Sequence, residues 1–272
     1  RESFMEIQND IVSEMARAVL PLIARDLWWG EAPAEDGPVA RRRARALEML
    51  AEWNGSMSEY DPEPLIFSAW MRALTRRIAA DELGTLFADI AGPRPLLVER
   101  VFHDVDGAGN WCDVIKTPEA EDCPTIARRA LDDALTALAE THGEDMSAWR
   151  WGVEHRAVHR HTPLGFSRLL GLIVNIAHES SGGDHTINVG RTPGRGAKPD
   201  ANVHAAGLRA VYDFADLDRS VFVIATGQSG HPLSRHYEDI GRLWRQGDYL
   251  AMSLDPEDAR AGSVGVTRLM PP

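Results

Sequence analysis

The sequence predicts an α+β fold in which helices form the first part of the chain and strands dominate the second. Through most of residues 1–147, apolar side chains recur every three or four positions, as they do in amphipathic helices. From Trp149 onward the pattern changes to short runs separated by turn residues, which is typical of strands. We therefore expect a mainly helical segment over residues 1–147, and a strand-rich segment over residues 148–272 that ends in a helix and a strand.

Four longer helices are predicted in the helical segment, together with shorter helices after Asp81. A loop rich in Pro, Glu and Gly over residues 30–38 separates the first two. Asn54-Gly55 ends the second helix, and Gly143 ends the fourth, because these residues tolerate the left-handed conformation that closes a helix. The predicted helices are residues 6–27, 41–53, 62–78 and 125–141.

Five strands and one further helix are predicted in the strand-rich segment. An Asp-rich turn joins the third and fourth strands, so we expect these two to be neighbours. The fourth strand leads into a turn of small residues, Gly227-Gln228-Ser229-Gly230. Pro232 and Ser234 then open a helix with apolar residues at helical spacing up to Trp244. The predicted strands are residues 151–161, 186–189, 207–214, 220–225 and 263–269.

The composition indicates a globular chain with an acidic surface. Hydrophobic residues make up 44% of the 272 positions, and 29 basic side chains against 41 acidic ones give a net charge of −12. Because phosphate groups are bound by clustered Lys and Arg, we expect neither nucleic acid nor an anionic membrane as a partner. The longest apolar run, residues 169–177, is interrupted by Gly171 and Asn175 and is shorter than the roughly 20 residues that span a bilayer. The first residues show no apolar core of a secretory signal.

Two cysteines, Cys112 and Cys123, enclose a short polar loop that contains Pro118. A pair that closes such a loop suits a disulfide, which would contribute about 3 kcal/mol for a loop of this size. Two reduced thiols in a cytosolic protein are the alternative. A metal site is disfavoured, because no C-x-x-C spacing or adjacent histidine completes it.

The turn Gly227-Gln228-Ser229-Gly230 has the residue types of a nucleophile elbow without its spacing. The G-x-S-x-G pattern needs the serine on a strained corner between strand and helix, and here the first glycine comes one position too early. His236 and Asp239 follow, but both fall on the predicted helix rather than on separate strand ends. We prefer the interpretation that small residues allow a tight backbone turn.

Three histidines, His155, His159 and His161, would face the same side of a strand, as metal ligands can. The neighbouring Arg156 and Arg160 add positive charge where a cation would bind. A solvated or interdomain strand face is therefore the preferred interpretation.

The loop His103-Asp104-Val105-Asp106-Gly107 carries paired aspartates, as calcium-binding loops do. Gly109 fits the sixth position of an EF-hand loop, but Ala108 and Ile115 supply no oxygen ligand at the fifth and twelfth positions. We predict no metal site in this chain.

Six stretches follow one another along the chain in an order that resembles the penicillin acylase (penicillin amidase) family of N-terminal nucleophile hydrolases. They are IQNDIVSEMARAVLPLI from residue 7, the WCD…C loop from residue 111, AWRWGVEHRAVHRH from residue 148, GGDHTIN from residue 182, TGQSGHPLSRHYEDIGRLW from residue 226 and HYEDIGRLWRQGDYLAM from residue 236. The resemblance implies an αββα sandwich built from a precursor that cuts itself into α and β chains. This chain would be the C-terminal portion of the β chain and would supply a helical layer and C-terminal strands.

The resemblance also implies where the chemistry lies. In that family the first residue of the β chain is a serine that attacks an amide carbonyl, with its own α-amino group as the base. Backbone amides and an asparagine stabilise the oxyanion. These residues map before Arg1, so no catalytic residue and no cofactor is expected in this chain, and any calcium is expected in the other segments. The implied partners are the α chain, the N-terminal part of the β chain and a small N-acyl amide substrate.

Asp213 is the candidate for a supporting role at that active site. It lies in a predicted strand among apolar residues, where a carboxylate needs a partner. Cephalosporin-acylase-like relatives carry a glutamate at the matching place, which supports a histidine near the catalytic serine. The resemblance implies that Asp213 orients a histidine of another segment. An ion pair with Arg209 or Arg219 is the alternative.

The family's members carry a similar cysteine loop and most of them are exported. The resemblance therefore favours a Cys112–Cys123 disulfide and a periplasmic or secreted location. Two alternatives to an enzyme that hydrolyses the side-chain amide of penicillins stay open. One is an acyl-homoserine-lactone or lipopeptide acylase of the same family, and the other is a non-catalytic binding protein that reuses the fold.

Overall fold

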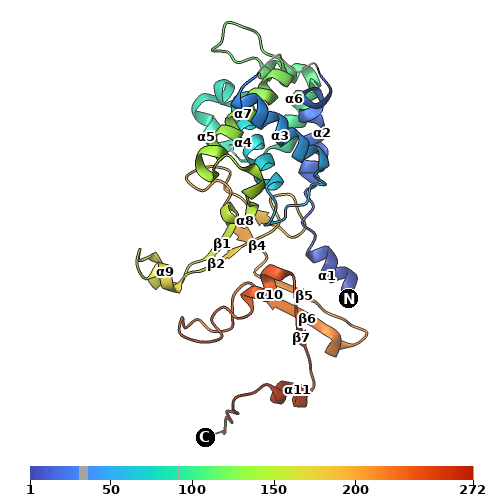
Figure 1. Cartoon of the computed structure of the whole chain (residues 1–272). Coiled ribbons are helices and arrows are strands. Elements are labelled where there is room, and N and C mark those ends of the chain that lie inside the picture. The colour runs from blue at the N-terminus through green and yellow to red at the C-terminus, as the bar shows by residue number, and fades with distance from the viewer. Residues whose placement is uncertain (31–35, 91, 272) are drawn as a thin grey trace. The chain divides into compact units, whose positions relative to one another are not determined.

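The computed structural model describes residues 1–30, 36–90 and 92–271, so the loop predicted over residues 30–38 lies mostly outside the described residues. Two compact units divide the chain (Figure 1). The helical unit consists of Asp10–Val158 and Ala177–Ala205. The sheet unit consists of Arg1–Asn9, His159–Ile176 and Ala206–Pro272. Both units are therefore assembled from pieces that are separated in sequence.

Five longer helices build most of the helical unit. Their bounds are α2 (Glu14–Trp29), α3 (Pro38–Glu52), α4 (Glu63–Leu83), α6 (Pro95–Phe102) and α7 (Cys123–His142). Shorter helical pieces connect them, namely η1 (Gly84–Leu86), α5 (Phe87–Ile90), η2 (Val105–Cys112), η3 (Met146–Ala148) and α8 (Trp151–Glu154). The helices predicted near residues 41–53, 62–78 and 125–141 are thus confirmed as α3, α4 and α7, each a few residues longer than expected.

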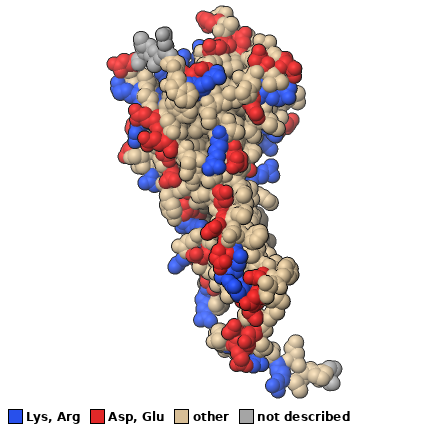
Figure 2. Space-filling view, turned by 90° about the vertical axis from the view of Figure 1, so that its right-hand side faces the viewer, with Lys and Arg blue, Asp and Glu red and all other residues tan. Residues whose placement is uncertain are grey.

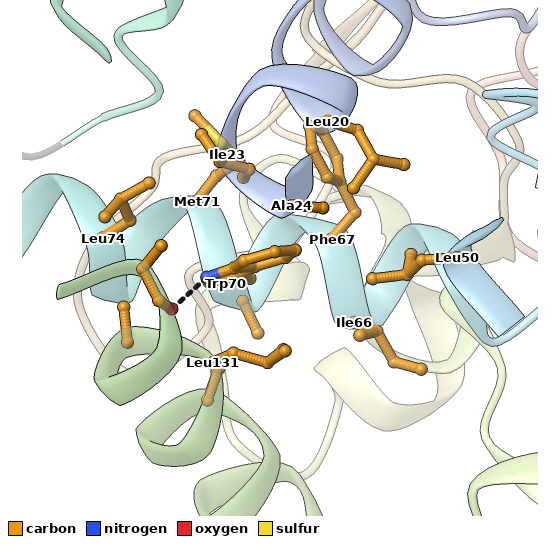
Figure 3. Close-up of a cluster of buried hydrophobic side chains, with 14 of the residues drawn as sticks. Leu20, Ile23, Ala24, Leu50, Ile66, Phe67, Trp70, Met71, Leu74 and Leu131 are labelled. Atoms are coloured by element: carbon orange, nitrogen blue, oxygen red, sulfur yellow. Dashed lines mark hydrogen bonds between the residues drawn. The ribbon is translucent and has the colours of Figure 1, made fainter. Parts of the chain in front are cut away.

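Helix α4 forms the centre of the helical unit, because its buried residues surround the helix instead of forming one stripe. Figure 3 shows Leu20 and Ile23 of α2 on one side of α4 and Leu131 of α7 on the other. Trp70 is fully buried between α4 and α7 and donates its indole N–H to the carbonyl of Ala127 at 2.9 Å. This bond satisfies the one polar group that the large side chain takes out of water.

The prediction of one continuous helix over residues 6–27 is wrong. The structure has α1 (Glu2–Gln8) and α2, with an irregular link between them. The carboxylate of Asp10 accepts the backbone N–H of Val12 at 2.8 Å. Ser13 then caps α2 by accepting the backbone N–H of Ala16 at 3.1 Å. These local bonds offer the backbone an alternative to a continuous helix, which the apolar periodicity alone does not reveal.

Seven short strands form three sheets within the described residues. Their bounds are β1 (Arg156–His159), β2 (Ile176–Glu179), β3 (Gly190–Arg191), β4 (His204–Ala205), β5 (Leu208–Val211), β6 (Ser220–Ile224) and β7 (Leu250–Met252). β1 pairs with β2, β3 pairs antiparallel with β4, and β5, β6 and β7 form an antiparallel sheet in that order. The prediction that the strands near residues 207–214 and 220–225 are neighbours is confirmed, with Leu208 opposite Ile224 and Val211 opposite Val221.

The remaining helical pieces belong to the sheet unit. They are α1, η4 (Leu164–Phe166), α9 (Gly171–Val174), η5 (Leu217–Arg219), α10 (Gly241–Gln246) and α11 (Pro256–Ala261). α1 is tied to the sheet by Gln8, whose amide donates to the carbonyl of Ala210 at 3.1 Å and whose oxygen accepts the hydroxyl of Tyr249 at 2.8 Å. Asn9 adds a bond to the carbonyl of Gly247 at 2.9 Å.

Three strand predictions and one helix prediction need correction. Residues 151–154 form α8 before the strand begins, and residues 186–189 form a turn held by Thr186, whose hydroxyl donates to the carbonyl of Asn188 at 2.8 Å. Residues 263–269 are irregular and exposed, because none of the described strands lies alongside to complete a ladder. The helix expected from Pro232 begins only at Gly241, since turns fill residues 231–240.

Candidate functional site

Asp213 lies directly after β5, at the start of the turn that leads to β6. Its backbone N–H donates to the hydroxyl of Ser220 at 3.1 Å, and its carboxylate accepts the backbone N–H of Ala215 at the same distance. The side chain is half-buried, and it forms no ion pair with any described residue. The predicted alternative of a pair with Arg209 or Arg219 is therefore not found in the described part of the chain. One backbone bond leaves most of the capacity of this carboxylate for another partner.

Arg209 on β5 contacts Asn9 and Trp244 instead of Asp213. Its guanidinium donates to the side-chain oxygen of Asn9 at 2.6 Å and to the carbonyl of Trp244, and it lies over the Trp244 ring at 5.4 Å. Burial lowers the pKa of Arg209 from its usual value. This buried cation links β5 to Asn9, which follows α1, and to α10. It could not be predicted, because the residue pattern around Arg209 is that of an ordinary strand.

The residues around Ser229 form a folded loop instead of a nucleophile and its base. Ser229 accepts the backbone N–H of His231 at 3.1 Å through its hydroxyl. The imidazole of His236 is bound on both sides, by Asp239 at 2.7 Å and by Arg235 at 2.9 Å. Since Arg235 can only donate, Nε2 of His236 accepts and Nδ1 donates to Asp239. No described bond joins the Ser229 hydroxyl to His236, so the loop has no proton path from serine to base.

Gly227 shows why small residues are needed in this loop. A Cβ atom on Gly227 would lie 2.1 Å from the carbonyl oxygen of His236. The close approach lets the backbone N–H of Gly227 reach the carbonyl of Tyr237 at 3.0 Å, and that of Ser229 reach His236 at 2.9 Å. The glycine therefore serves the turn.

The three histidines have separate surroundings. His155 is fully buried, stacks on Trp151 at 4.4 Å and bonds through Nδ1 to the carbonyl of Asp200 at 2.7 Å. His159 lies edge-on to Trp244, and His161 contacts Tyr237. Burial lowers the pKa of His155 and of His159 from their usual values. Among the described residues, no group of three His, Cys, Asp or Glu side chains could hold a metal ion.

The aspartates of the 103–107 loop are engaged within the loop. Asp104 has a left-handed backbone and accepts the N–H of Gly109 at 2.9 Å, while Asp106 pairs with Arg100 at 3.2 Å. Left-handed backbone at a non-glycine residue is uncommon, and Asp tolerates it because its carboxylate can bond locally. This loop is therefore shaped by its own side chains.

The disulfide between Cys112 and Cys123 is formed, with 5.0 Å between the two Cα atoms. Glu121 organises the loop that it closes. Its carboxylate accepts the hydroxyl of Thr117 at 2.8 Å and the backbone N–H of Val114 at 3.1 Å, and it pairs with Arg129 of α7. The Thr117 hydroxyl and the Arg129 guanidinium hold the pKa of Glu121 below its usual value. The loop is fixed to α7 by covalent and ionic links together.

A cavity of about 1360 Å³ lies in the helical unit beside α4 and α7. Alanines such as Ala73 and Ala134 line it, and charges of both signs surround it, including Arg76 and Asp133. The loop around residues 194–200 borders it and is fixed by Asp200, which is buried, pairs with Arg72 and accepts the hydroxyl of Ser68 at 2.7 Å. The described lining also includes the hydroxyl side chains of Thr85 and Thr141.

The fold as a whole is similar to a known hydrolase fold. A thermostable penicillin G acylase from Alcaligenes faecalis superposes with a TM-score of 0.58 at 16% sequence identity, covering 100% of this chain and 49% of that one. The predicted α+β class and N-terminal nucleophile hydrolase fold are confirmed by this likeness.

The chain belongs to the penicillin amidase family, whose family model matches residues 1–261. An acyl-homoserine lactone acylase QuiP from Pseudomonas syringae pv. syringae (strain B728a) is 31% identical over 233 residues, which are 82% of this chain and 28% of that protein. The penicillin acylase 2 proenzyme of Pseudomonas sp. (strain SE83) is 28% identical over 228 residues, again 82% of this chain and 28% of the relative. The chain thus spans less than a third of the length of these relatives.

Proposed function

We propose that this chain is the C-terminal part of the β chain of an amidohydrolase that cleaves N-acyl compounds, such as the side-chain amide of penicillins. The observation that carries the proposal is the family match over residues 1–261, combined with a span of 28% of the relatives' length. A match through nearly the whole chain is expected for a structural portion of such an enzyme. The helical unit and the β5–β6–β7 sheet would complete a fold whose reacting groups lie on another segment.

The proposed reaction takes place on that other segment. An N-terminal serine attacks the amide carbonyl and its free α-amino group takes the hydroxyl proton, while an asparagine and backbone amides bind the oxyanion. The amine leaves with a proton, and water then releases the acyl group from the serine. The absence of a serine–histidine bond at Ser229 supports placing the nucleophile elsewhere. Within this mechanism Asp213 is proposed as a positioning residue that orients a histidine near the serine.

Acyl-homoserine lactones are a second candidate substrate class. Six relatives at 26–31% identity carry the name acyl-homoserine lactone acylase, against one named penicillin acylase at 28%. The same serine chemistry would serve both, and the acyl pocket alone would differ.

We further propose that the chain is produced by processing of a precursor, pairs with the α chain and the N-terminal part of the β chain, and resides in the periplasm or outside the cell. The Cys112–Cys123 disulfide supports an oxidising compartment. Figure 2 shows acidic side chains interspersed with basic ones on the face in view, which supports a protein partner over nucleic acid. No helix among the described residues is long and apolar enough to cross a membrane. Any calcium would be held by the companion segments.

The experiment that tests this function identifies every polypeptide in the native preparation by intact mass and N-terminal sequencing. We expect a companion chain that begins with serine. The same preparation is then assayed with phenylacetyl, glutaryl and long-chain acyl amides and with an acyl-homoserine lactone. Hydrolysis of the lactone derivative alone would select the second candidate, whereas a single 30.0 kDa species without hydrolysis of any substrate would show a binding protein that reuses the fold.

A further inference from the structure

The loop between β1 and β2 carries a concentration of exposed apolar side chains on the sheet unit. Leu172 and Ile173 are 83% and 79% exposed, and Phe166 is 70% exposed. Arg168 is the only charged residue between Thr162 and Asn175. We call these side chains the 164–173 surface, which consists of Leu164, Phe166, Leu169, Leu170, Leu172 and Ile173. An apolar concentration of this kind marks an interaction site, whereas single exposed apolar residues need no explanation.

The 164–173 surface is held in a defined shape by bonds inside the loop. Asn175 donates its amide to the carbonyl of Gly165 at 3.1 Å and accepts the backbone N–H of His161 at 3.0 Å. A Cβ atom on Gly165 would lie 2.1 Å from the side-chain oxygen of Asn175, and one on Gly171 would lie 2.8 Å from the carbonyl oxygen of Gly165. Two glycines therefore allow the loop to fold back on itself, with the short helix α9 at its far end (Figure 1).

The end of the loop is buried in the sheet unit, whereas the side chains of the 164–173 surface are exposed. Val174 and Ile176 are buried, and the hydroxyl of Tyr237 donates to the carbonyl of Val174 at 2.5 Å. The inward positions are thus filled by Val174 and Ile176. A preformed loop that presents apolar groups gives up little conformational freedom on binding, as an interface requires.

We propose that the 164–173 surface is the docking site for the remaining segment of the same precursor, on which the serine is placed above. The inference rests on the proposed function and identifies the contact through which the two parts assemble. The length of the relatives favours this segment as the occupant of the surface, because about 70% of each relative lies outside the region matched by this chain. It is also favoured by charge, because a surface with one charged residue suits the apolar interior of a permanent interface. A bilayer is disfavoured for a chain of net charge −12.

The test expresses this chain together with its own companion segment, tagged on the companion, and measures how much of this chain co-purifies. The double variant L172E/I173E places two carboxylates on the surface. We expect at least a tenfold lower ratio of this chain to companion, because each carboxylate would be buried without a partner. V264E/V266E is the matched control, since its two valines are 89% and 84% exposed in the same unit, and it should co-purify like wild type. Equal recovery of all three proteins would overturn the inference.

A second measurement keeps the test valid if L172E/I173E does not fold. Hydroxyl-radical labelling of Phe166 and Leu172 in the wild-type chain is compared with and without the companion. At least fivefold lower labelling in the complex supports the inference. Unchanged labelling contradicts it. Protection that is seen only with phosphatidylcholine vesicles, or only with a second copy of the chain, also contradicts it. An assembled wild-type complex without amidase activity would overturn the proposed function and leave the docking result standing. If the complex is active and the L172E/I173E variant is recovered as well as the wild type, the docking inference is overturned and the proposed function stands.

Discussion

Asp213 and His155 show how single residues acquire their roles from their surroundings. The carboxylate of Asp213 accepts one bond, from the backbone N–H of Ala215, and forms no ion pair among the described residues, so it has capacity for a group on another segment. His155 is the opposite case, because it is fully buried, stacks on Trp151 and bonds to the carbonyl of Asp200 inside the helical unit. Both residues attract attention in the sequence, but only their contacts separate a candidate positioning residue from a core residue.

Asp213→Asn should lower kcat/KM of the assembled enzyme by roughly 10–100-fold, as loss of a group that orients a functional histidine does. It should also move the acidic limb of the pH–rate profile, which a structural role alone would not do. The thermal unfolding midpoint should stay unchanged, and Asp213→Glu should recover part of the activity. Asp216→Asn in the same exposed turn is the control. Unaltered kinetics and pH profile for Asp213→Asn would assign this aspartate to the turn alone.

His155 should make stability fall with decreasing pH. Burial lowers its folded-state pKa, with Asp200 and Asp184 acting in the opposite direction, so the folded protein keeps it neutral. The unfolded chain takes up a proton below pH about 6.5, and the free energy of unfolding should then fall by up to about 1.4 kcal/mol per pH unit. Urea denaturation between pH 7.5 and 5 measures this slope. His155→Asn should make this slope smaller, with the remainder due to groups such as His159, and exposed His103→Asn should leave it as in wild type.

Among the secondary-structure elements, α4 carries the core of the helical unit. Trp70→Ala should lower the free energy of unfolding by about 3–5 kcal/mol, because it leaves a cavity in the core and removes the bond from the indole N–H to the carbonyl of Ala127. Urea denaturation gives this value, and Trp29→Ala should cost little, since Trp29 is 76% exposed. A similar cost for both variants would show that α4 does not have this central role.

The cysteine loop is the second element whose contribution can be measured. Replacing both cysteines by serine should cost about 3 kcal/mol, because the bond closes a short loop and restricts the unfolded chain. Adding dithiothreitol should destabilise the wild type and leave the Ser/Ser variant unaffected. Peptide mapping of unreduced protein should find Cys112 linked to Cys123. Two alkylated thiols in that experiment would contradict the prediction.

Most helices could be predicted from the sequence, whereas most strand boundaries could not. α3 and α7 have strong periodic patterns, and α7 has a clear end signal in Gly143, whose φ is 85°. The break before α2 depends on side-chain bonds of Asp10 and Ser13 that compete locally with the helix. Strands depend on neighbours that are distant in sequence, so the alternation over residues 263–269 had no predictive value without a strand beside it.

The candidate site could be predicted only in part, for a related reason. The cysteine pair could be predicted, whereas Asp213 was predicted within a strand and lies after β5, which ends at Val211. The network of His155, Asp200 and Arg72 could not be predicted, because it joins three segments that no local sequence pattern connects. The contacts of Arg209 could not be predicted either, because its partners Asn9 and Trp244 lie 200 and 35 residues away in the sequence.

At the scale of the whole molecule, both units are discontinuous in sequence. The helical unit needs residues 177–205, which supply Asp200 to Arg72 and to His155. A fragment of residues 1–147 should therefore unfold with lower cooperativity and a lower midpoint than the full chain, although it contains all the longer helices of the unit. Circular dichroism during urea denaturation measures both quantities. A cooperative transition at the midpoint of the full chain would show that residues 1–147 are sufficient.

The bonds between α1 and the sheet have a consequence for the order of events during synthesis. Gln8 and Asn9 bind Ala210 and Gly247, which lie 202 and 238 residues further along the chain, so each contact can form only after the ribosome has made the later residue. Contacts between such distant residues close slowly. The sheet unit is therefore expected to close only after the residues around Gly247 have been made, so that its folding follows the synthesis of its last strands.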